Sequence, residues 1–307
     1  DTTVRILFMQ DRGILAMTDY QREILVGLTE NAGLDSRQVQ MLLARFKTLE
    51  DLLAADHYQL TELHGIDDDI AHTITSLEHS LENIRDQLHD YAESGIHTMT
   101  ILDPDYPDLL RETSDPPFVL YYRGNFPLQS ETFIAFAGSS HATAEGLAIS
   151  VDYGKALADT GAVIVSGLSR GVDTSAHLGA IKANGRSYAV LGCGFSHIYP
   201  SENERLAEEL LEKGALISEY PPDTEADDHK LLMRNRIIVG LSHSLVLGEI
   251  DRNSKGTIDT AERAKNLGKL TFAIGDKDTP IDPGLVEYGA IPIEDISQAD
   301  MIARHSF

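Results

Sequence analysis

Short apolar runs alternate with helical stretches from Phe133 onward, and this alternation constrains the fold more than any other feature. Most of the runs are rich in Val, Ile, Leu and Ala, and several are followed by glycine or a small polar residue. Such runs form strands buried on both faces, and their alternation with helices is typical of a doubly wound, mostly parallel sheet of the α/β class. The predicted strands are Phe133–Ala137, Ala162–Ser166, Tyr188–Leu191, Leu216–Glu219, Leu245–Glu249 and Leu270–Ile274.

The segment Ser166–His177 joins one of these strands to a helix through a glycine-rich loop. Gly167 and Gly171 permit a tight turn, and Asp173 is suited to cap the helix that follows. Backbone N–H groups at a helix start attract phosphate or carboxylate, and Arg170 could add a charge-assisted hydrogen bond. Because any strand-to-helix turn favours such residues, the pattern alone leaves anion binding and a structural turn equally open.

Glycines and small polar residues also follow the other predicted strands. Ligands of a parallel sheet bind beyond the C-terminal ends of its strands, so we expect these residues to border one site. They are Gly138-Ser139-Ser140, Gly192-Cys193-Gly194, Glu219-Tyr220-Pro221-Pro222 and Gly256-Thr257. Cys193 fits as a small residue rather than a reactive thiol. No nucleophile is paired with a histidine and no cluster has metal-ligand spacing, so we expect no catalytic residue, cofactor or metal site.

The formal net charge of −24 restricts the possible partners. An acidic chain repels nucleic acid at long range, so a nucleic-acid role depends on a local basic pocket and should weaken with salt. A single cysteine excludes an internal disulfide and suits a reducing compartment. There is neither an apolar run of membrane-spanning length nor a signal-peptide pattern, so we expect a cytoplasmic protein without a membrane partner.

The chain before the alternating region divides into two further parts. Residues 1–95 are predicted to form a small helical domain and residues 131–307 the α/β domain. Residues 96–130 are predicted to form a proline-rich connector whose edge strands pack on the α/β domain. Within the first domain, Leu60–Ala71 is similar to a helix-hairpin-helix module, of the kind also found in SAM-like domains. The carboxylates of Asp67–Asp69 would repel a phosphate backbone, which favours a structural or protein-docking role.

Together these motifs resemble the DNA-processing protein A (Smf) family. The resemblance runs from about Leu42 to Ala290. Its most specific segments are Ser166–Asp173 with His177, Ala189–Gly194 and Ile198–Asn203. Further matches follow in order at Ser218–Pro222, Arg234–Ile238 and Gly256–Ala261.

The resemblance implies an extended Rossmann-like domain and a non-enzymatic homodimer that binds single-stranded DNA and delivers it to the RecA recombinase during natural transformation. Family members often carry a C-terminal winged-helix-like domain, which we expect this chain, ending at Phe307, to lack. The implied DNA- or phosphate-binding residues are Gly138, Ser139, Ser140, Ser166, Gly167, Ser169, Arg170, Gly171, Asp173, Gly192, Gly194, Asn203, Arg234, Asn235, Arg236, Lys255, Gly256 and Thr257.

Several residues depart from the family pattern. Ser140 replaces the arginine of a Gly-Ser-Arg turn, and Ser201 stands where some members carry a basic residue. Each lost cation removes about one phosphate contact, so we expect weaker binding than in basic members. Further departures are Leu231-Leu232-Met233 in place of Phe-Pro-x and Lys255-Gly256-Thr257 in place of Ser-Gly-Ser. The cations that remain are Arg170, Arg234, Arg236, Lys255 and Lys230.

The two arginines of the Arg-Asn-Arg segment receive different interpretations. We expect Arg234 to face the ligand, because a guanidinium matches phosphate geometry and stacks on bases. Arg236 could equally well be buried, with one of the arginines pairing with Glu219 or Glu249.

Three other side chains have a structural alternative. His177 could hydrogen bond to Asp173 on the same helix face and is expected to be structural rather than catalytic. Tyr199 and Tyr220, each before a proline, could stack on bases or pack beneath a loop.

Two other functions are open from the residues. Lys255–Glu262 partly matches the Gly-Gly-x-Gly-Thr loop and catalytic glutamate of the lysine-decarboxylase-like Rossmann group, which would make the chain a nucleotide-binding or phosphoribohydrolase-like protein. A docking module that uses the acidic helical domain is the third possibility.

Overall fold

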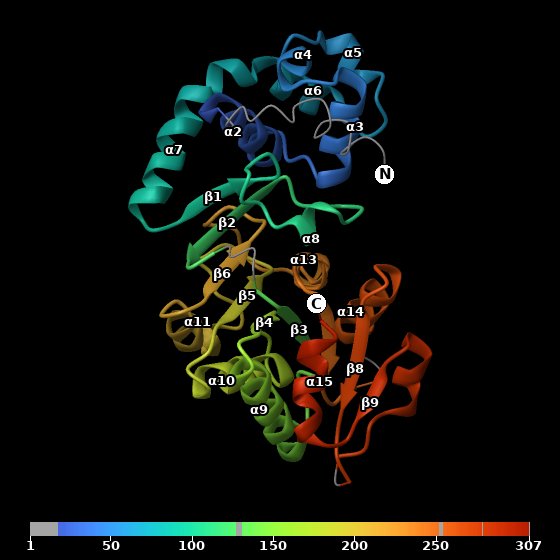
Figure 1. Cartoon of the computed structure of the whole chain (residues 1–307). Helices are drawn as coiled ribbons and strands as arrows, with labels where there is room; N and C mark the ends of the chain where they lie inside the picture. Colours follow the sequence, from blue (N-terminus) through green and yellow to red (C-terminus); the bar gives the residue numbers. More distant parts are fainter. Residues whose placement is uncertain (1–17, 127–130, 252–253, 278, 307) are drawn as a thin grey trace. The chain divides into compact units, whose positions relative to one another are not determined.

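The computed structural model describes residues 18–126, 131–251, 254–277 and 279–306 of the 307-residue chain. The chain forms two compact units (Figure 1). The first comprises Asp1–Tyr106 and Ser114–Leu120, and the second comprises Pro107–Thr113 and Tyr121–Phe307. The proline-rich connector therefore contributes residues to both units.

The first unit is mainly helical, as the spacing of its apolar residues predicts. In α3, Val39, Leu42, Leu43 and Phe46 form one buried face. The elements are α2 (Asp19–Val26), η1 (Gly27–Asn31), α3 (Ser36–Phe46), α4 (Leu49–Leu53), α5 (His57–Thr61), α6 (Asp68–Ser76), η2 (Leu77–Ser80), α7 (Leu81–Glu93) and the strand β1 (His97–Thr100).

The predicted hairpin is formed by α5 and α6. Gly65 in its turn has φ +85°, a conformation that favours glycine. Asp67 caps α6, since its carboxylate accepts a hydrogen bond from the Ile70 N–H at 2.9 Å. Asp67, one of the three carboxylates expected to repel a phosphate backbone, thus has a local structural role.

The second unit contains a mostly parallel sheet with the strand order β2-β6-β5-β4-β3-β7-β8-β9. Only β2 among these described strands runs antiparallel to its neighbour, pairing Tyr121 with Ser218. The strands are β2 (Val119–Gly124), β3 (Phe133–Ala137), β4 (Val163–Ser166), β5 (Ser187–Leu191), β6 (Ala215–Ser218), β7 (Ser244–Leu247), β8 (Leu270–Ile274) and β9 (Ile291–Ile293).

Helices cover both faces of this sheet. Figure 1 shows α9 and α10 side by side, and both contribute to a core that includes Ile134, Leu157 and Ala176. The helices are α8 (Asp108–Arg111), α9 (Ala144–Asp159), α10 (Val172–Lys182), η3 (Ser201–Asn203), α11 (Glu204–Leu210), α12 (Asp228–Met233), α13 (Asn235–Leu241), α14 (Lys255–Asn266), η4 (Pro283–Tyr288), η5 (Ile296–Gln298) and α15 (Ala299–Arg304).

The α/β fold class is confirmed. All six predicted strands are present, and two, β3 and β8, have the predicted bounds. Strand β9 was not predicted, because Ile291–Ile293 has only three residues and a central proline.

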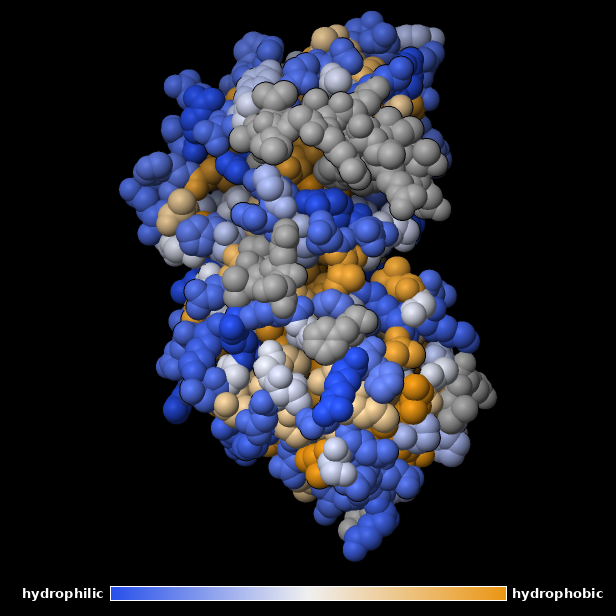
Figure 2. All heavy atoms as spheres, in the orientation of Figure 1, coloured by the Kyte–Doolittle hydropathy of each residue, from blue (hydrophilic) through white to orange (hydrophobic). Residues whose placement is uncertain are grey.

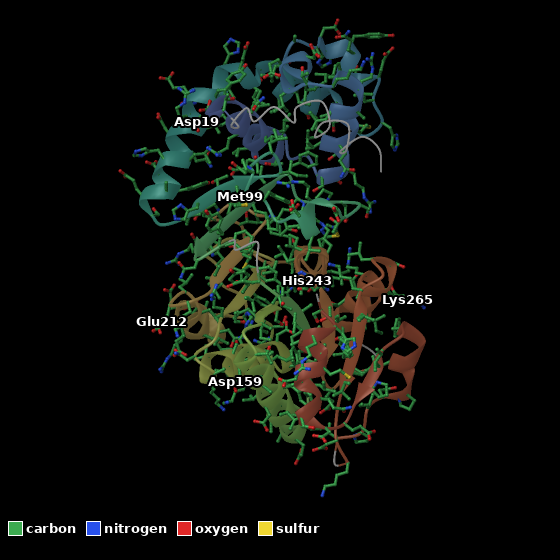
Figure 3. The ribbon with its side chains drawn as sticks, in the orientation of Figure 1. Asp19, Met99, Asp159, Glu212, His243 and Lys265 are labelled. Carbon is green, nitrogen blue, oxygen red and sulfur yellow. The ribbon has the colours of Figure 1, made fainter. Side chains whose placement is uncertain are left out.

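The two ends of the sheet differ in character. Asp159 and Glu212, labelled in Figure 3, lie in segments that lead into β4 and β6, so they mark the end where these strands begin. Glycine-rich loops occupy the opposite end.

Exposed hydrophobic side chains include Leu267, Leu270 and Ile291, and Figure 2 shows orange surface on the side of α14 and β8. Among the described residues, no helix combines the length and apolarity needed to cross a membrane.

Candidate functional site

A cavity of about 520 Å³ lies at the C-terminal end of β3 and is bordered by α12, α13 and α14. One part of its wall is apolar, formed by Phe136, Leu231, Leu232 and Ile238. The other part is polar and contains nine of the residues that the family resemblance implies. These are Gly138, Ser140, Ser169, Asp173, Arg234, Asn235, Lys255, Gly256 and Thr257.

Arg234 lines the cavity, as expected, but its guanidinium is bonded to the protein itself. It donates to the backbone oxygens of Gly167 and Val190, the latter at 2.7 Å, and to Ser169 Oγ at 2.8 Å. Its Nε donates to Asn235 Oδ1 at 3.1 Å. The side chain is 6% exposed. Arg234 therefore joins the loop after β4 to strand β5 and has little donor capacity left for a ligand.

Asp173 is the buried carboxylate beside this arginine. Its Oδ2 lies 3.9 Å from Arg234 Nη2 and accepts the Ser169 N–H at 3.3 Å. Burial raises the pKa of Asp173 above its ordinary value, although Arg234 and Ser169 oppose the shift. Burial likewise lowers the pKa of Arg234. The pair contributes little net charge to the cavity.

The start of α10 differs from the prediction. The N-cap is Gly171, at φ 75°, and Asp173 lies within the first turn rather than capping it. The Val172 N–H donates to Ser139 O at 3.1 Å, and the Thr174 N–H donates to Ser169 O at 3.2 Å. These amides are engaged within the protein, so the expected anion cradle is partly occupied by backbone oxygens.

Most of the glycines at the strand ends allow close packing between loops. A Cβ on Gly167 would lie 2.1 Å from Arg234 Cζ, and one on Gly138 would lie 2.6 Å from a methyl of Val172. Comparable contacts would arise at Gly171, Gly192 and Gly194, whose nearest neighbours are backbone atoms at 2.2, 2.8 and 2.1 Å. At these positions, close packing between loops explains the glycines that suggested a phosphate-binding loop.

The first turn of α14 presents a more open surface to the cavity. A Cβ on Gly256 would meet nothing within 4 Å, and the Lys255 side chain is exposed. Thr257 Oγ1 donates to Gly138 O at 2.9 Å, and Asn235 Nδ2 donates to Gly256 O at 3.2 Å. These bonds fix the helix start against β3 and α13, while Lys255 forms no ion pair with a described residue.

The other predicted cations, Arg170, Arg236 and Lys230, are paired with carboxylates and do not line the cavity. Arg170 donates to both oxygens of Glu202, with Nη2 to Oε2 at 2.9 Å. Hydrogen bonding to Glu202 and then to Tyr199 raises the pKa of Arg170. Arg236 is buried and donates to Glu219, one of the two partners that the sequence left open.

Lys230 is likewise engaged, because it pairs with Asp227. Its Nζ also lies 6.0 Å from the centre of the Tyr220 ring. Lys255 is therefore the predicted cation that is left accessible at the cavity, within the part of the chain that the structure describes.

The remaining predicted residues support the loops around the cavity. Ser139 and Ser166 are buried, and Ser166 Oγ donates to Phe136 O at 2.6 Å. Asn203 Nδ2 donates to Leu168 O at 2.8 Å and to Thr174 Oγ1 at 2.9 Å. Leu168 has φ 60°, which is unusual for a non-glycine residue, and Asn203 holds it in that conformation.

His177 is fully buried and does not form the expected bond to Asp173. Its Nδ1 lies 2.6 Å from Ser187 Oγ, whose hydroxyl donates to Ile164 O. The ring therefore donates from Nδ1, and Nε2 has no hydrogen-bond partner among the described residues. Burial lowers the pKa of His177 to about 3. Burial also raises the pKa of Cys193, which makes a reactive thiolate unfavourable.

Several cavity residues were not identified from the sequence. Asp228 and His229 belong to α12, and Ser254 and Thr260 belong to the segment that contains α14. Their only sequence signal is proximity to Arg234 and Gly256. Glu262 of the proposed nucleotide loop is exposed and is not part of the cavity wall.

One group of potential metal ligands lies elsewhere. His89, Asp90 and Glu93 of α7 bring their ligand atoms within 4.8 Å of one another, and all three side chains are exposed. Such exposed acidic groups are common without an ion, so the absence of a metal site stays a prediction.

Comparisons with known proteins support the resemblance. The family model described as DNA recombination-mediator protein A matches residues 97–290. The DNA processing protein DprA of Bacillus subtilis is 38% identical over 185 residues, which are 60% of this chain and 62% of that protein. Protein Smf of Synechocystis is 32% identical over 240 residues, or 77% of this chain and 60% of that protein. The matched segments span about three fifths of these two relatives.

Solved structures give the same result. The crystal structure of DNA processing protein A from Streptococcus pneumoniae matches with a TM-score of 0.71 and 27% identity, covering 94% of this chain and 98% of that one. A Helicobacter pylori structure, described for its single-stranded DNA binding mode, matches with a TM-score of 0.61 and 27% identity, covering 68% and 96%. Because the family model also covers more than half of the chain, this protein belongs to the DNA recombination-mediator protein A family.

Proposed function

We propose that the second unit binds single-stranded DNA at the cavity, and that the protein acts as a non-enzymatic recombination mediator. We further propose that it works as a homodimer and delivers the strand to the RecA recombinase. Support comes from the family assignment and from the H. pylori relative, which is described for its binding of single-stranded DNA.

The observation that carries the proposal is the cavity itself, which combines an apolar wall with an accessible cation. Leu231, Leu232 and Ile238 offer an apolar surface to a base, and Lys255 offers a positive charge to a phosphate. Serine and threonine hydroxyls border the same space. Single-strand binding combines apolar or aromatic contact to bases with cationic contact to the backbone.

The electrostatics of the protein limit the affinity. The chain carries a net charge of −24, the Arg234–Asp173 pair adds little net charge to the cavity, and the remaining charged residues of its wall include Asp228 and Lys255. Few phosphates can therefore be neutralised, and the affinity should be modest and should fall as salt is added. This agrees with the expectation of weaker binding that follows from Ser140 and Ser201.

Fluorescence anisotropy with a labelled oligothymidylate tests the proposal. We expect saturable binding at low salt that weakens at moderate salt. A duplex of the same length and a panel of mononucleotides, the latter followed by thermal shift, serve as comparisons. Stabilisation by a mononucleotide without oligonucleotide binding would favour the nucleotide-binding alternative and overturn the proposal.

A further inference from the structure

Arg170 lies immediately outside the cavity. The preceding residue, Ser169, lines the cavity, while Arg170 points to the surface with half of its side chain exposed. Consecutive Cα atoms are about 3.8 Å apart, so a strand that leaves the cavity past Ser169 comes within reach of this guanidinium.

The Arg170 guanidinium is occupied by Glu202. Both oxygens of the carboxylate accept hydrogen bonds from it, and the Glu202 side chain is 52% exposed. An ion pair on the surface contributes little to stability, because water screens it. A DNA phosphate presents the same paired oxygens as a carboxylate and can replace Glu202 in this arrangement.

An exposed aromatic ring lies in the same segment. Tyr199 is 45% exposed, which is unusual for a large aromatic residue in this unit. Its side chain hydrogen bonds to Arg170. An aromatic ring beside a guanidinium is a common platform for an unpaired base. The pair therefore offers both a stacking surface and a phosphate contact.

The position of Glu202 is fixed by its neighbour. Asn203 donates to Leu168 O and to Thr174 Oγ1, which ties the short helix η3 to the loop that carries Arg170. Glu202 is thus held opposite Arg170 by a buried contact rather than by the surface ion pair alone.

On the basis of the proposed function, we propose that Arg170 and Tyr199 form an accessory contact for the DNA strand beside the cavity. Glu202 lowers the affinity of this contact, because it competes with a phosphate for the Arg170 guanidinium.

The variant Glu202→Gln tests the competition. We expect its affinity for a labelled oligothymidylate at low salt to rise by roughly three- to tenfold, because one phosphate contact becomes available. The dependence of log K on log salt should also steepen by about 0.7, the value for one additional phosphate on a single strand. A purely structural role of Glu202 would not change this slope.

Three further variants make the test specific. Glu209→Gln is the matched control, since it removes a partly exposed carboxylate that pairs with Arg205 on α11, and it should leave affinity and salt slope unchanged. Arg170→Gln combined with Glu202→Gln should abolish the gain. Tyr199→Ala should weaken binding by about fivefold or more, through loss of stacking. Thermal unfolding checks that each variant is folded.

The outcomes separate the two proposals. If the wild-type protein binds the oligonucleotide but Glu202→Gln matches it in affinity and salt slope, the accessory contact is wrong and the cavity proposal stands. If the folded wild-type protein does not bind even at low salt, both proposals fail.

Discussion

The Arg234 guanidinium and the Asp173 carboxylate lie 3.9 Å apart in the cavity wall, and their side chains are 6% and 10% exposed. Arg234 also bonds to the backbone oxygens of Gly167, in the loop after β4, and of Val190, in the neighbouring strand β5. Arg234, which we expected to contact a DNA phosphate, therefore has a mainly structural role in the cavity wall.

Replacing Arg234 by alanine should destabilise the protein strongly. The change removes the bonds to the loop after β4 and to β5, and it leaves Asp173 buried without its cation, so we expect a loss of about 3–5 kcal/mol in the free energy of unfolding. Urea denaturation followed by circular dichroism measures it. Arg170→Ala, at an exposed arginine of the same site, should change stability little. A stable Arg234→Ala variant that has lost only DNA binding would contradict this role.

Gly167, which packs against Arg234, and Gly256, which lines the cavity, should respond oppositely to alanine. A Cβ at Gly167 would overlap the Arg234 guanidinium, so Gly167→Ala should cost about 1–3 kcal/mol. Gly256 lies in the first turn of α14 with no atom near its Cβ position, so Gly256→Ala should stabilise the protein by about 0.5–1 kcal/mol. Thermal and urea unfolding of both variants test the contrast. Equal effects would mean that the packing around Gly167 is looser than described.

His177 should make the protein sensitive to acid. Its pKa is about 3 in the folded protein and 6.5 as a model value, so the unfolded chain binds a proton first as the pH falls. The stability contribution is complete above pH 6.5 and is lost as the pH falls toward 3, by about 1.4 kcal/mol per pH unit.

The variant His177→Gln isolates this contribution, because the carboxylates that also titrate in acid are common to both proteins. The difference in unfolding free energy between wild type and variant should shrink steadily between pH 6.5 and pH 4.5. A difference that does not change with pH would show that His177 is accessible to protons in the folded state.

The sequence predicted the sheet well, because each buried parallel strand is a local apolar run. The predicted bounds of β3 and β8 were correct, and Gly138, Gly167 and Gly192 follow strand ends as predicted. The prediction was wrong for Gly256, which lies in the first turn of α14. The family was also recognisable, since its motifs follow these same strand ends in order.

The roles of the site residues were harder to predict, because they depend on contacts that are distant in sequence. Arg234 bonds to Gly167, 67 positions away, and Asn203 bonds to Leu168, 35 positions away. Residue type suggested phosphate contacts at both positions, whereas the backbone oxygens that they meet are brought together only by the fold. The ion pair of Arg170 with Glu202, 32 positions away, is likewise formed only by the fold.

Lys255 should contribute to DNA binding without contributing to stability. It is exposed at the first turn of α14, borders the cavity and pairs with no described carboxylate. Lys255→Ala should therefore weaken oligothymidylate binding and reduce the salt slope by about 0.7, as expected for the loss of one phosphate contact. Lys265 is exposed in the last turn of the same helix and is labelled in Figure 3. Lys265→Ala removes the same charge from the protein without touching the cavity. If both variants weaken binding equally, the effect comes from net charge alone, and DNA does not bind at the start of α14.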